Sequence, residues 1–256
     1  MISAGIDAGS RSIKVVLLDL DTHQVLACGQ TNQGVHQEAL AQDLFLHLLE
    51  QTGVDQSNLR GIIATGYGRN LIGFADTTVT EITCHARGVC HTVPSARTIV
   101  EIGGQDSKCI RLNGDGTVRD FAMNDRCAAG TGRFLEVVAA RLGVTLDALG
   151  ALAKHAKSPA HISSTCVVFA ETEIIGLLAS GAAPADIVAG VLIAVSTRVG
   201  AMAGRHVEDP VLFTGGVALI PGMVDCLKET LGHPVCVAPE PQFTGALGAA
   251  LTSASP

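Results

Sequence analysis

The chain contains two copies of one strand–turn–strand pattern, and this repeat limits the fold more than any other feature. The first copy, ISAGIDAGSRSIKVVLLDL, begins at Ile2, and the second, TIVEIGGQDSKCIRLNGDG, begins about 95 residues later at Thr98. Each copy has an apolar strand, a turn rich in Gly, Asp and Ser, a lysine and a second strand. Because a solenoid needs several shorter repeats, two copies at this spacing predict two similar halves.

The turns of both copies have the composition of phosphate-binding loops. Glycines let backbone N–H groups approach an anion, and serine hydroxyl groups add donors. Asp7 and Asp106 are predicted to hold Mg²⁺ through water, because magnesium keeps most of its hydration shell. A tight hairpin without a ligand is the alternative for either copy taken alone. The predicted nucleotide-binding residues of the turns are Asp7, Gly9, Ser10, Arg11, Ser12, Lys14, Gly103, Gly104, Gln105 and Asp106.

Two further glycine-rich segments precede predicted helices. The GTG of residues 130–132 opens a helix expected over about 130–142, and TGGVAL at 214–219 opens another after an apolar strand. A helix N-terminus binds anions readily, although helix–strand packing alone can also require glycine. Neither GxxxxGK[ST] nor GxGxxG occurs, which excludes the commonest NTPase and dinucleotide motifs but not ATP. Gly130, Thr131, Gly132, Gly215 and Gly216 therefore join the predicted nucleotide site.

Cys127 and Cys166 stand where helices are predicted to begin, the second helix spanning about 166–180. No CxxC pattern occurs, so no local loop chelates a metal. A helix N-terminus favours negative charge, which suits a thiolate ligand or a redox group. Unreactive thiols and a zinc site are the alternatives. The other cysteines are predicted to be buried small hydrophobic residues in a reducing cytosol: Cys28, Cys84, Cys90, Cys109, Cys226 and Cys236.

The composition excludes several classes of function. A hydrophobic fraction of 47% and 29 glycines in 256 residues favour a compact α/β protein. A formal net charge of −7, no tryptophan and one tyrosine argue against a nucleic-acid partner. The chain opens on a predicted strand rather than a signal segment, and the apolar run at 187–195 is shorter than a bilayer span. We therefore expect a cytoplasmic protein with no membrane partner.

Hydrophobic spacing predicts the remaining elements. A helix is expected at 36–53, a strand and turn at 59–69, a strand end leading into a helix at 77–93, and a helix from Pro184 to about Arg205. The predicted domains are 1–95 and 96–243, with a last helix at 244–256 packed on the first domain. His85 is interpreted as a hydrogen-bonded polar residue, and a second metal site with Cys84 and Cys90 is the alternative.

This arrangement resembles the sugar kinase/actin/heat-shock-chaperone superfamily, which has a two-domain, ribonuclease-H-like duplicated α/β fold. The resemblance implies that paired hairpins bind ATP and Mg²⁺ and that TGGVAL borders the adenosine. Glu81, at the start of EITCHARG, matches the place of an acidic residue near the attacked phosphate. Either Glu81 or Gln105 would then orient the water for in-line attack. For Glu81 the alternative is a first-turn acid that complements the helix dipole.

A narrower resemblance covers nearly the whole chain. GIDAGSRSIK, ATGYGR, EITCHARG, IGGQDSK, NDRCAAGTGRFLE, CVVFAETEII and TGGVA occur in the order and spacing of the ATP-dependent activators of 2-hydroxyacyl-CoA dehydratases. The same family includes the ATPase subunits of benzoyl-CoA reductases. The resemblance implies that Cys127 and Cys166 bind one [4Fe–4S] cluster across the two-fold axis of a homodimer. Such a cluster needs about four thiolates, and a symmetric dimer, the commonest oligomer, would supply two cysteines from each chain.

The family resemblance implies an ATPase coupled to electron transfer. A reduced ferredoxin or flavodoxin would supply one electron, and a 2-hydroxyacyl-CoA dehydratase or a related reductase would accept it. Glu136 and Gln242 complete the predicted nucleotide site. Arg11 departs from the family pattern, which often has a small hydroxyl residue in the first loop. A small-molecule kinase and an actin-like assembly module, both on the same fold, are the alternatives from other classes.

Overall fold

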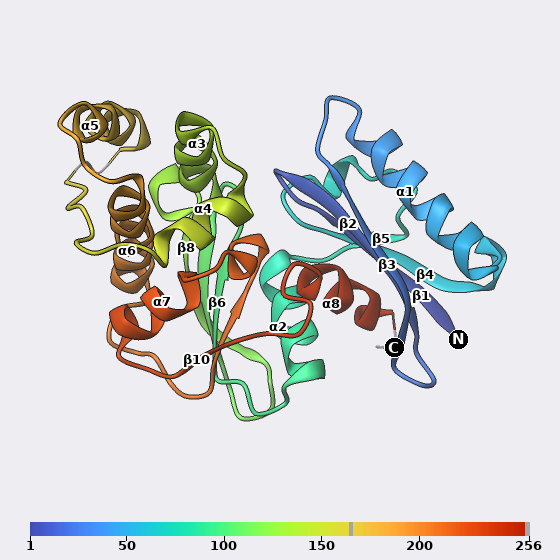
Figure 1. Ribbon diagram of the computed structural model, residues 1–256. Helices are drawn as coiled ribbons and strands as arrows, with labels where there is room; N and C mark the ends of the chain where they lie inside the picture. The colour runs from blue at the N-terminus through green and yellow to red at the C-terminus, as the bar shows by residue number, and fades with distance from the viewer. Residues whose placement is uncertain (164–165, 254–256) are drawn as a thin grey trace. The chain divides into compact units, whose positions relative to one another are not determined.

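The computed structural model describes residues 1–163 and 166–253, and the chain forms two compact units (Figure 1). Unit 1 comprises residues 1–96, 112–119 and 238–256, and unit 2 comprises residues 97–111 and 120–237. The sequence prediction places its boundaries at 95 and 243. Of the predicted last helix, Thr244–Thr252 forms α8 within unit 1, and residues 254–256 lie outside the described residues.

Unit 1 is built on a mixed five-stranded sheet with strand order β3-β2-β1-β4-β5. The first three strands form antiparallel pairs, and β1, β4 and β5 run parallel. The strands are β1 (Ile2–Ala8), β2 (Ser12–Asp19), β3 (Gln24–Asn32), β4 (Leu59–Thr65) and β5 (Thr77–Thr78). The first predicted strand–turn–strand copy is therefore the antiparallel hairpin β1–β2.

Helices cover both faces of this sheet, and β2 is therefore apolar at successive positions. Ile13, Val15 and Leu17 pack with α1 (Gln37–Thr52), which contributes Phe45 and Leu48 among others. Val16 and Leu18 point to the other face and pack with α8, including Ala246 and Leu247. A strand buried on both faces has a continuous apolar run rather than an alternating one. The uninterrupted apolar run VVLL, residues 15–18, is explained by this burial on both faces.

Glycines let α8 lie directly against α2 (Glu81–Thr92) and against β1. A Cβ atom on Gly248 would lie 1.7 Å from the carbonyl oxygen of Cys84, and one on Gly88 would lie 2.0 Å from that of Thr244. A Cβ atom on Gly5 of β1 would lie 1.9 Å from the carbonyl oxygen of Ala246. These are backbone-to-backbone contacts, so a side chain at any of the three positions would force the elements apart.

Unit 2 repeats the sheet plan with strand order β10-β9-β6-β7-β8. Its central β6 is antiparallel to β7 and parallel to β9. The strands are β6 (Thr98–Ile102), β7 (Ser107–Leu112), β8 (Val118–Asn124), β9 (Val211–Thr214) and β10 (Val235–Val237). The helices are α3 (Gly132–Leu142), α4 (Leu146–Ala153), α5 (Val167–Ala179), α6 (Pro184–Ala203) and α7 (Met223–Leu231).

Two predicted helix starts differ from the structure. TGGVAL forms a 3₁₀ turn, Gly216–Leu219, and α7 begins only at Met223, because Pro221 and the left-handed Gly222 interrupt the helix. The segment after Cys127 first forms a 3₁₀ turn, Ala128–Gly130, and α3 begins at Gly132. Helix α4 was not predicted from the sequence. Thr145 caps its first turn by accepting a hydrogen bond from the Ala148 N–H.

Helix α6 is the only described helix long and apolar enough, by length and composition, to span a membrane. It has 20 residues, and its most apolar 18-residue stretch has a mean hydropathy of 1.6. The helix extends beyond the predicted run at 187–195 at both ends, so the prediction that judged length from that run alone does not hold for the whole helix. Half of its most apolar stretch is buried, and Ile187, Val191 and Val195 lie in the core of unit 2. A core helix of this kind passes the same test of length and composition.

The predicted burial of six cysteines is confirmed only in part. Cys84 and Cys109 are buried, and Cys90 and Cys226 are half-buried. Cys28 and Cys236 are exposed, so the prediction is wrong for these two. Both lie on edge strands, β3 and β10, where one side of the strand has no neighbour in the sheet. Cys127 and Cys166 are also exposed.

Candidate functional site

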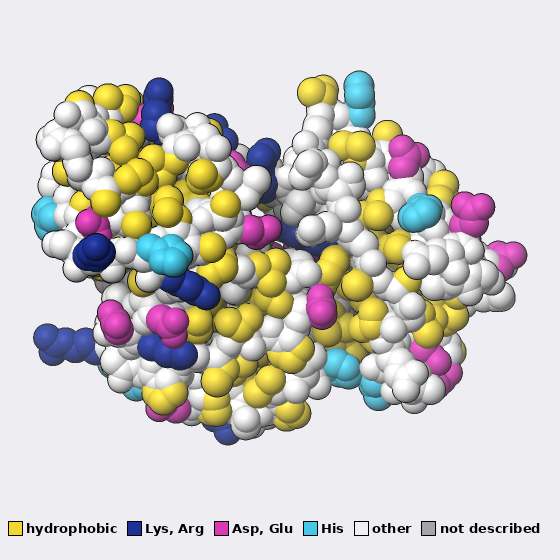
Figure 2. All heavy atoms as spheres, in the orientation of Figure 1, with side chains coloured by type: hydrophobic (Ala, Val, Ile, Leu, Met, Phe, Trp, Pro, Cys, Tyr) yellow, Lys and Arg dark blue, Asp and Glu magenta, His cyan; other side chains and the backbone are white. Residues whose placement is uncertain are grey.

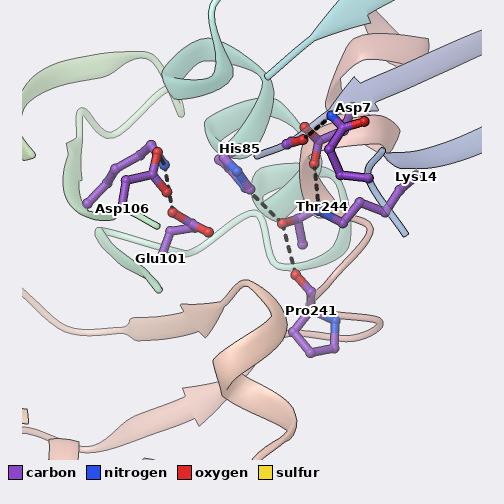
Figure 3. A network of polar contacts seen from close by, with 10 residues as sticks. Asp7, Lys14, His85, Glu101, Asp106, Pro241 and Thr244 are labelled. Carbon is purple, nitrogen blue, oxygen red and sulfur yellow. Dashed lines mark hydrogen bonds and ion pairs between the residues drawn. The ribbon is translucent and has the colours of Figure 1, made fainter. Parts of the chain in front are cut away.

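The first predicted phosphate turn is the tight connection between β1 and β2. Asp7, near the end of β1, is 7% exposed and lies opposite Lys14 in the hairpin register. The Lys14 Nζ atom is 3.4 Å from Asp7 Oδ2 (Figure 3). A Cβ atom on Gly9 would lie 2.9 Å from the carbonyl oxygen of Ser12, so the turn requires glycine there. Ser10 and Ser12 are half-buried in the same turn.

Gln33, which directly follows β3, holds this turn from the side. Its Nε2 donates a 2.8 Å hydrogen bond to the carbonyl oxygen of Gly9, and its backbone N–H donates one of 3.0 Å to that of Arg11. The Arg11 side chain is exposed. The turn backbone is thus fixed by a third strand, while the arginine that departs from the family pattern projects to the surface.

The second predicted phosphate turn connects β6 and β7. The Gly103 N–H donates to the carbonyl oxygen of Asp106 at 3.0 Å, which closes the turn. Lys108, 1% exposed, lies 2.8 Å from Glu101 Oε2 and 2.9 Å from Asp106 Oδ2. Glu101 is itself 4% exposed, and Figure 3 shows it beside Asp106. Gly104 is half-buried and Gln105 is exposed at the tip of the turn.

The strand registers show which residues of the two turns are equivalent. Asp7 lies opposite Lys14 in the first hairpin, and Glu101 lies opposite Lys108 in the second. Both pairs are seven residues apart, and the shift from each member to its counterpart is 94 residues. Glu101 is therefore the counterpart of Asp7, and Asp106 corresponds to Ser12. Glu101 is not among the predicted site residues, because Asp106 rather than Glu101 was paired with Asp7; aligning Lys14 with Lys108 identifies it.

The duplication extends to the neighbouring parallel strands. β4 ends in Thr65 and is followed by Gly66, and β9 ends in Thr214 and is followed by Gly215. The two glycines have φ values of 89° and 88°. A Cβ atom on Gly66 would lie 2.4 Å from Asp7 Oδ1, and one on Gly215 would lie 2.7 Å from Glu101 Oε1. In each unit a left-handed glycine thus packs its backbone against the hairpin carboxylate.

The predicted GTG segment meets the second turn within unit 2. The N–H groups of Gly132 and Arg133 donate to the carbonyl oxygens of Gly103 and Gly104, at 2.9 and 2.8 Å. Thr131 is fully buried and caps α3 by accepting from Arg133 N–H. Gly130 is buried in the preceding 3₁₀ turn. Glu136, one turn into α3, lies 3.1 Å from Arg133 Nη1.

The other predicted nucleotide residues are divided between the units. Glu81 is the first residue of α2 in unit 1, is half-buried, and follows the N-cap Thr80. Gln242 also belongs to unit 1 and donates to Glu240 Oε2 at 3.3 Å, while its buried Oε1 has no hydrogen-bond partner among the described residues. Gly216, in unit 2, is exposed at the start of its 3₁₀ turn.

Cys166 occupies the N-cap position of an α-helix, as predicted, whereas Cys127 is the N-cap of a three-residue 3₁₀ turn and α3 begins only at Gly132. Cys127 precedes the 3₁₀ turn Ala128–Gly130, and Cys166 precedes α5. Neither thiol caps its helix, and both side chains are exposed. No group of three or more metal-ligating side chains occurs in the described part of the chain. Cysteine thiolates are the usual ligands of a [4Fe–4S] cluster, so these two exposed cysteines fit such a group by ligand type.

The alternative metal site at His85 has no support in the geometry. The His85 Nδ1 atom is 2.9 Å from Thr244 Oγ1, which in turn donates to the carbonyl oxygen of Pro241 at 3.3 Å (Figure 3). Burial raises the pKa of the neighbouring Cys84 thiol to about 11, which disfavours the thiolate that a metal would need. Among the described residues these side chains do not form a metal-binding group.

Residues 4–253 match the model of the BadF/BadG/BcrA/BcrD ATPase family. The chain belongs to this family. A relative from Anaerotignum propionicum, named activator of lactoyl-CoA dehydratase, is 45% identical over 98% of this chain and 96% of its own length. The (R)-2-hydroxyglutaryl-CoA dehydratase activating ATPase of Acidaminococcus fermentans is 41% identical over 96% of this chain and 95% of its own length.

Solved structures of other proteins share the fold of this chain over nearly its whole length. The activator of 2-hydroxyisocaproyl-CoA dehydratase from Clostridium difficile, solved with bound ADPNP, has a TM-score of 0.94 and 38% identity, covering 99% of this chain and 94% of that one. The ethanolamine utilization protein EutJ from Carboxydothermus hydrogenoformans, at 18% identity and a TM-score of 0.62, shares the fold alone, covering 98% of this chain and 89% of its own. The predicted duplicated fold of the sugar kinase/actin/heat-shock-chaperone superfamily is confirmed.

Proposed function

We propose that this ATPase is an activator of a 2-hydroxyacyl-CoA dehydratase, to which it passes one low-potential electron while it hydrolyses ATP. One observation carries the proposal. A single chain has duplicated phosphate turns and two exposed cysteines at helix starts, and the segment after Cys127 is hydrogen-bonded to the second phosphate turn. The names of the relatives at 45% and 41% identity support the same function.

The duplicated turns fit ATP and Mg²⁺ by their chemistry. Both turns are tight and contain glycine, and hydrogen bonds from Gln33 and Gly103 fix their backbones. A fixed glycine-containing turn lets its backbone approach phosphate oxygens closely. Asp7 and Asp106 would hold the magnesium through water, and Lys14 would contact phosphate. Glu81 or Gln105 would orient the attacking water. The buried carboxylate of Glu101 joins this set as the counterpart of Asp7.

The proposed active species is a homodimer that holds one [4Fe–4S] cluster through the two copies of Cys127 and Cys166. When bound, such a cluster stores and releases a single electron at low potential. Helix α5, which begins beside Cys166, has an apolar exposed face, with Val168 67%, Phe169 69% and Ile175 44% exposed. Figure 2 shows hydrophobic side chains at the surface over this region. A face of this kind next to a cysteine supports contact with a second copy.

Anaerobic purification tests this proposal. We expect about four iron and four sulfide per homodimer, and a paramagnetic signal after reduction that changes when ATP is added. Alanine at Cys127 or Cys166 should remove the iron and abolish activation of a candidate dehydratase. A colourless homodimer without iron or sulfide would refute the electron-transfer function. A phosphorylated small molecule formed in proportion to the ATP consumed would instead identify a kinase.

The second candidate within the family is the ATPase component of a benzoyl-CoA-type reductase. A relative from Thauera aromatica, named as one of the subunits of benzoyl-CoA reductase, is 33% identical over 99% of this chain and 93% of its own length. Reconstitution with each partner class separates the two candidates. We further propose a ferredoxin or flavodoxin as the electron donor and the cytoplasm as the location. The net charge of −7 favours neither a nucleic-acid nor an anionic membrane partner.

A further inference from the structure

Asn124, the last residue of β8, pairs its carboxamide with both peptide groups of Cys127. Its Nδ2 donates a 2.7 Å hydrogen bond to the carbonyl oxygen of Cys127, and its Oδ1 accepts one of 3.1 Å from the Cys127 N–H. One planar side chain therefore fixes the orientation of the whole Cys127 backbone. The direction of the Cα–Cβ bond, which carries the sulfur, is fixed with it.

The same carboxamide lies against the segment that leads to the second phosphate turn. A Cβ atom on Gly130 would be 3.4 Å from Asn124 Nδ2 and 3.5 Å from Arg198 Cβ, so Gly130 is enclosed on two sides. Two residues later, Gly132 N–H is bonded to the carbonyl oxygen of Gly103 in that turn. Hydrogen bonds thus hold both ends of a six-residue segment, 127–132, one end to Asn124 and the other to the second phosphate turn.

Helix α5, which begins directly after Cys166, is held by a different arrangement. The carboxylate of Glu173, on α5, accepts hydrogen bonds of 2.9 and 2.7 Å from the backbone N–H and the hydroxyl of Ser163. Helix α5 is joined to α3 by the ion pair between Arg141 and Glu171. The Cys166 side is therefore linked to the body of α3, whereas the Cys127 side is linked directly to the phosphate turn.

We propose that Asn124 is the positioning residue through which the second phosphate turn controls the direction of the Cys127 thiolate. The inference rests on the proposed function, in which Cys127 is a cluster ligand. A shift of Gly103 and Gly104 on nucleotide binding is passed through Gly132 to the 128–130 turn. The Asn124 carboxamide makes Cys127 follow that turn as one rigid group. The two hydrogen bonds of Asn124 act together, because either bond alone would leave the Cys127 backbone free to rotate about it.

Three variants of the full chain test the role of the carboxamide. Asn124→Ala removes both hydrogen bonds. Asn124→Asp keeps the acceptor for the Cys127 N–H but replaces the donor to the carbonyl oxygen by a second acceptor. Asn113→Ala is the matched control, since Asn113 Nδ2 makes one hydrogen bond of 2.9 Å, to Thr117 Oγ1, in the exposed β7–β8 turn. Hydrogen exchange of the Cys127 N–H is measured by NMR on metal-free protein, and the paramagnetic spectrum on reduced, iron-loaded homodimer.

We expect Cys127 N–H exchange about twofold to tenfold faster in Asn124→Ala, the factor that one lost hydrogen bond gives. The spectrum should change in both Asn124 variants and should stay as in the parent in Asn113→Ala. An unchanged exchange rate in Asn124→Ala, or a parental spectrum in Asn124→Asp, would overturn the inference. Absence of iron from the parent homodimer would refute the proposed function instead, and the exchange rates would still decide whether Asn124 fixes Cys127.

Discussion

Glu101 is the structural counterpart of Asp7, and each of these carboxylates lies opposite a lysine seven residues further along the chain. The two pairs are equivalent in register but differ in burial. Lys14 and Asp7 side chains are 16% and 10% exposed and 3.4 Å apart, whereas Lys108 and Glu101 side chains are 1% and 6% exposed and 2.8 Å apart. The duplication thus gives one open carboxylate–lysine pair and one enclosed pair.

The enclosed pair should be the more sensitive to loss of its lysine. Lys108→Met leaves the Glu101 charge buried without its partner, which costs about 3–5 kcal/mol in the free energy of unfolding. Lys14→Met should cost less, because Asp7 remains closer to solvent. Urea denaturation of both variants gives the comparison. An equal or larger loss for Lys14→Met would contradict the assignment of the two environments.

Replacing the whole enclosed pair should restore stability but not activity. In the double variant Glu101→Leu, Lys108→Met the buried pair is removed, and the Asp106 carboxylate that loses its contact with Lys108 is 21% exposed and keeps access to water. Replacements of a buried pair by apolar residues are often neutral or stabilising. We expect unfolding within about 1 kcal/mol of the parent together with loss of ATP hydrolysis. Retention of ATP hydrolysis would show that Glu101 and Lys108 are only structural.

The left-handed glycines behind the two carboxylates are open to a sharper test. Alanine at Gly66 or Gly215 has two costs, the positive φ and the contact of its Cβ atom with Asp7 or Glu101. Gly53 has φ of 67° and nothing within 4 Å of its Cβ position, so Gly53→Ala has the φ cost alone, about 1–2 kcal/mol. We expect only Gly66→Ala and Gly215→Ala to weaken ATP binding, measured by calorimetry. Equal ATP affinity in all three variants would show that the contact is unimportant.

Alanine substitutions at two helix glycines, one closely packed and one not, should change stability in opposite directions. Gly248→Ala forces α8 away from α2, because its Cβ atom would lie 1.7 Å from the carbonyl oxygen of Cys84. Overpacking of this kind costs about 1–3 kcal/mol. Gly176, inside α5, has nothing within 4 Å of its Cβ position, so Gly176→Ala should stabilise by up to about 1 kcal/mol. Thermal unfolding of the two variants measures whether the stability falls in Gly248→Ala and rises in Gly176→Ala.

Cys84 should make folding stability depend on pH in alkaline solution. Burial raises its pKa from the ordinary 9.0 to about 11. Below pH 9 the thiol is protonated in both the folded and the unfolded chain. Between about pH 9 and pH 11 the unfolded chain loses this proton while the folded chain keeps it, so stability falls as pH rises. The Cys84 contribution to this fall is on the order of 2 kcal/mol.

Urea denaturation at several pH values, compared between the parent and Cys84→Ala, isolates this contribution. The variant should show the flatter decline over that range. Cys236→Ala, at an exposed position on β10, is the matched control and should follow the parent. Parallel curves for the parent and Cys84→Ala would show that the thiol titrates normally in the folded protein.

The repeat in the sequence was enough to predict the duplicated hairpins, because strand period and turn composition are local properties. The equivalence of Asp7 and Glu101 needed the strand register, which depends on the pairing of β6 with β7. Asn124 lies in a predicted motif, yet its bonds to Cys127 depend on how the chain leaves β8. Local patterns predicted the elements and the two turns, and tertiary contacts determine how these elements are connected.

The errors in the sequence predictions have the same origin. TGGVAL was expected to open an α-helix, but Pro221 and Gly222 delay the start of α7 to Met223. Cys28 and Cys236 were expected to be buried because cysteine usually is, and their edge-strand positions expose them. Whether a strand lies at the edge or the centre of a sheet is decided by distant pairings, which neighbouring residues do not reveal.

The position of α8 has a consequence for synthesis on the ribosome. α8 completes unit 1 but follows all of unit 2 along the chain, and Ser3 Oγ donates to the carbonyl oxygen of Ala250, 247 residues away. While unit 2 emerges, Val16 and Leu18 of β2 lack the apolar cover that α8 gives. The nascent chain therefore carries an incomplete first half that needs protection from aggregation until its last helix leaves the exit tunnel.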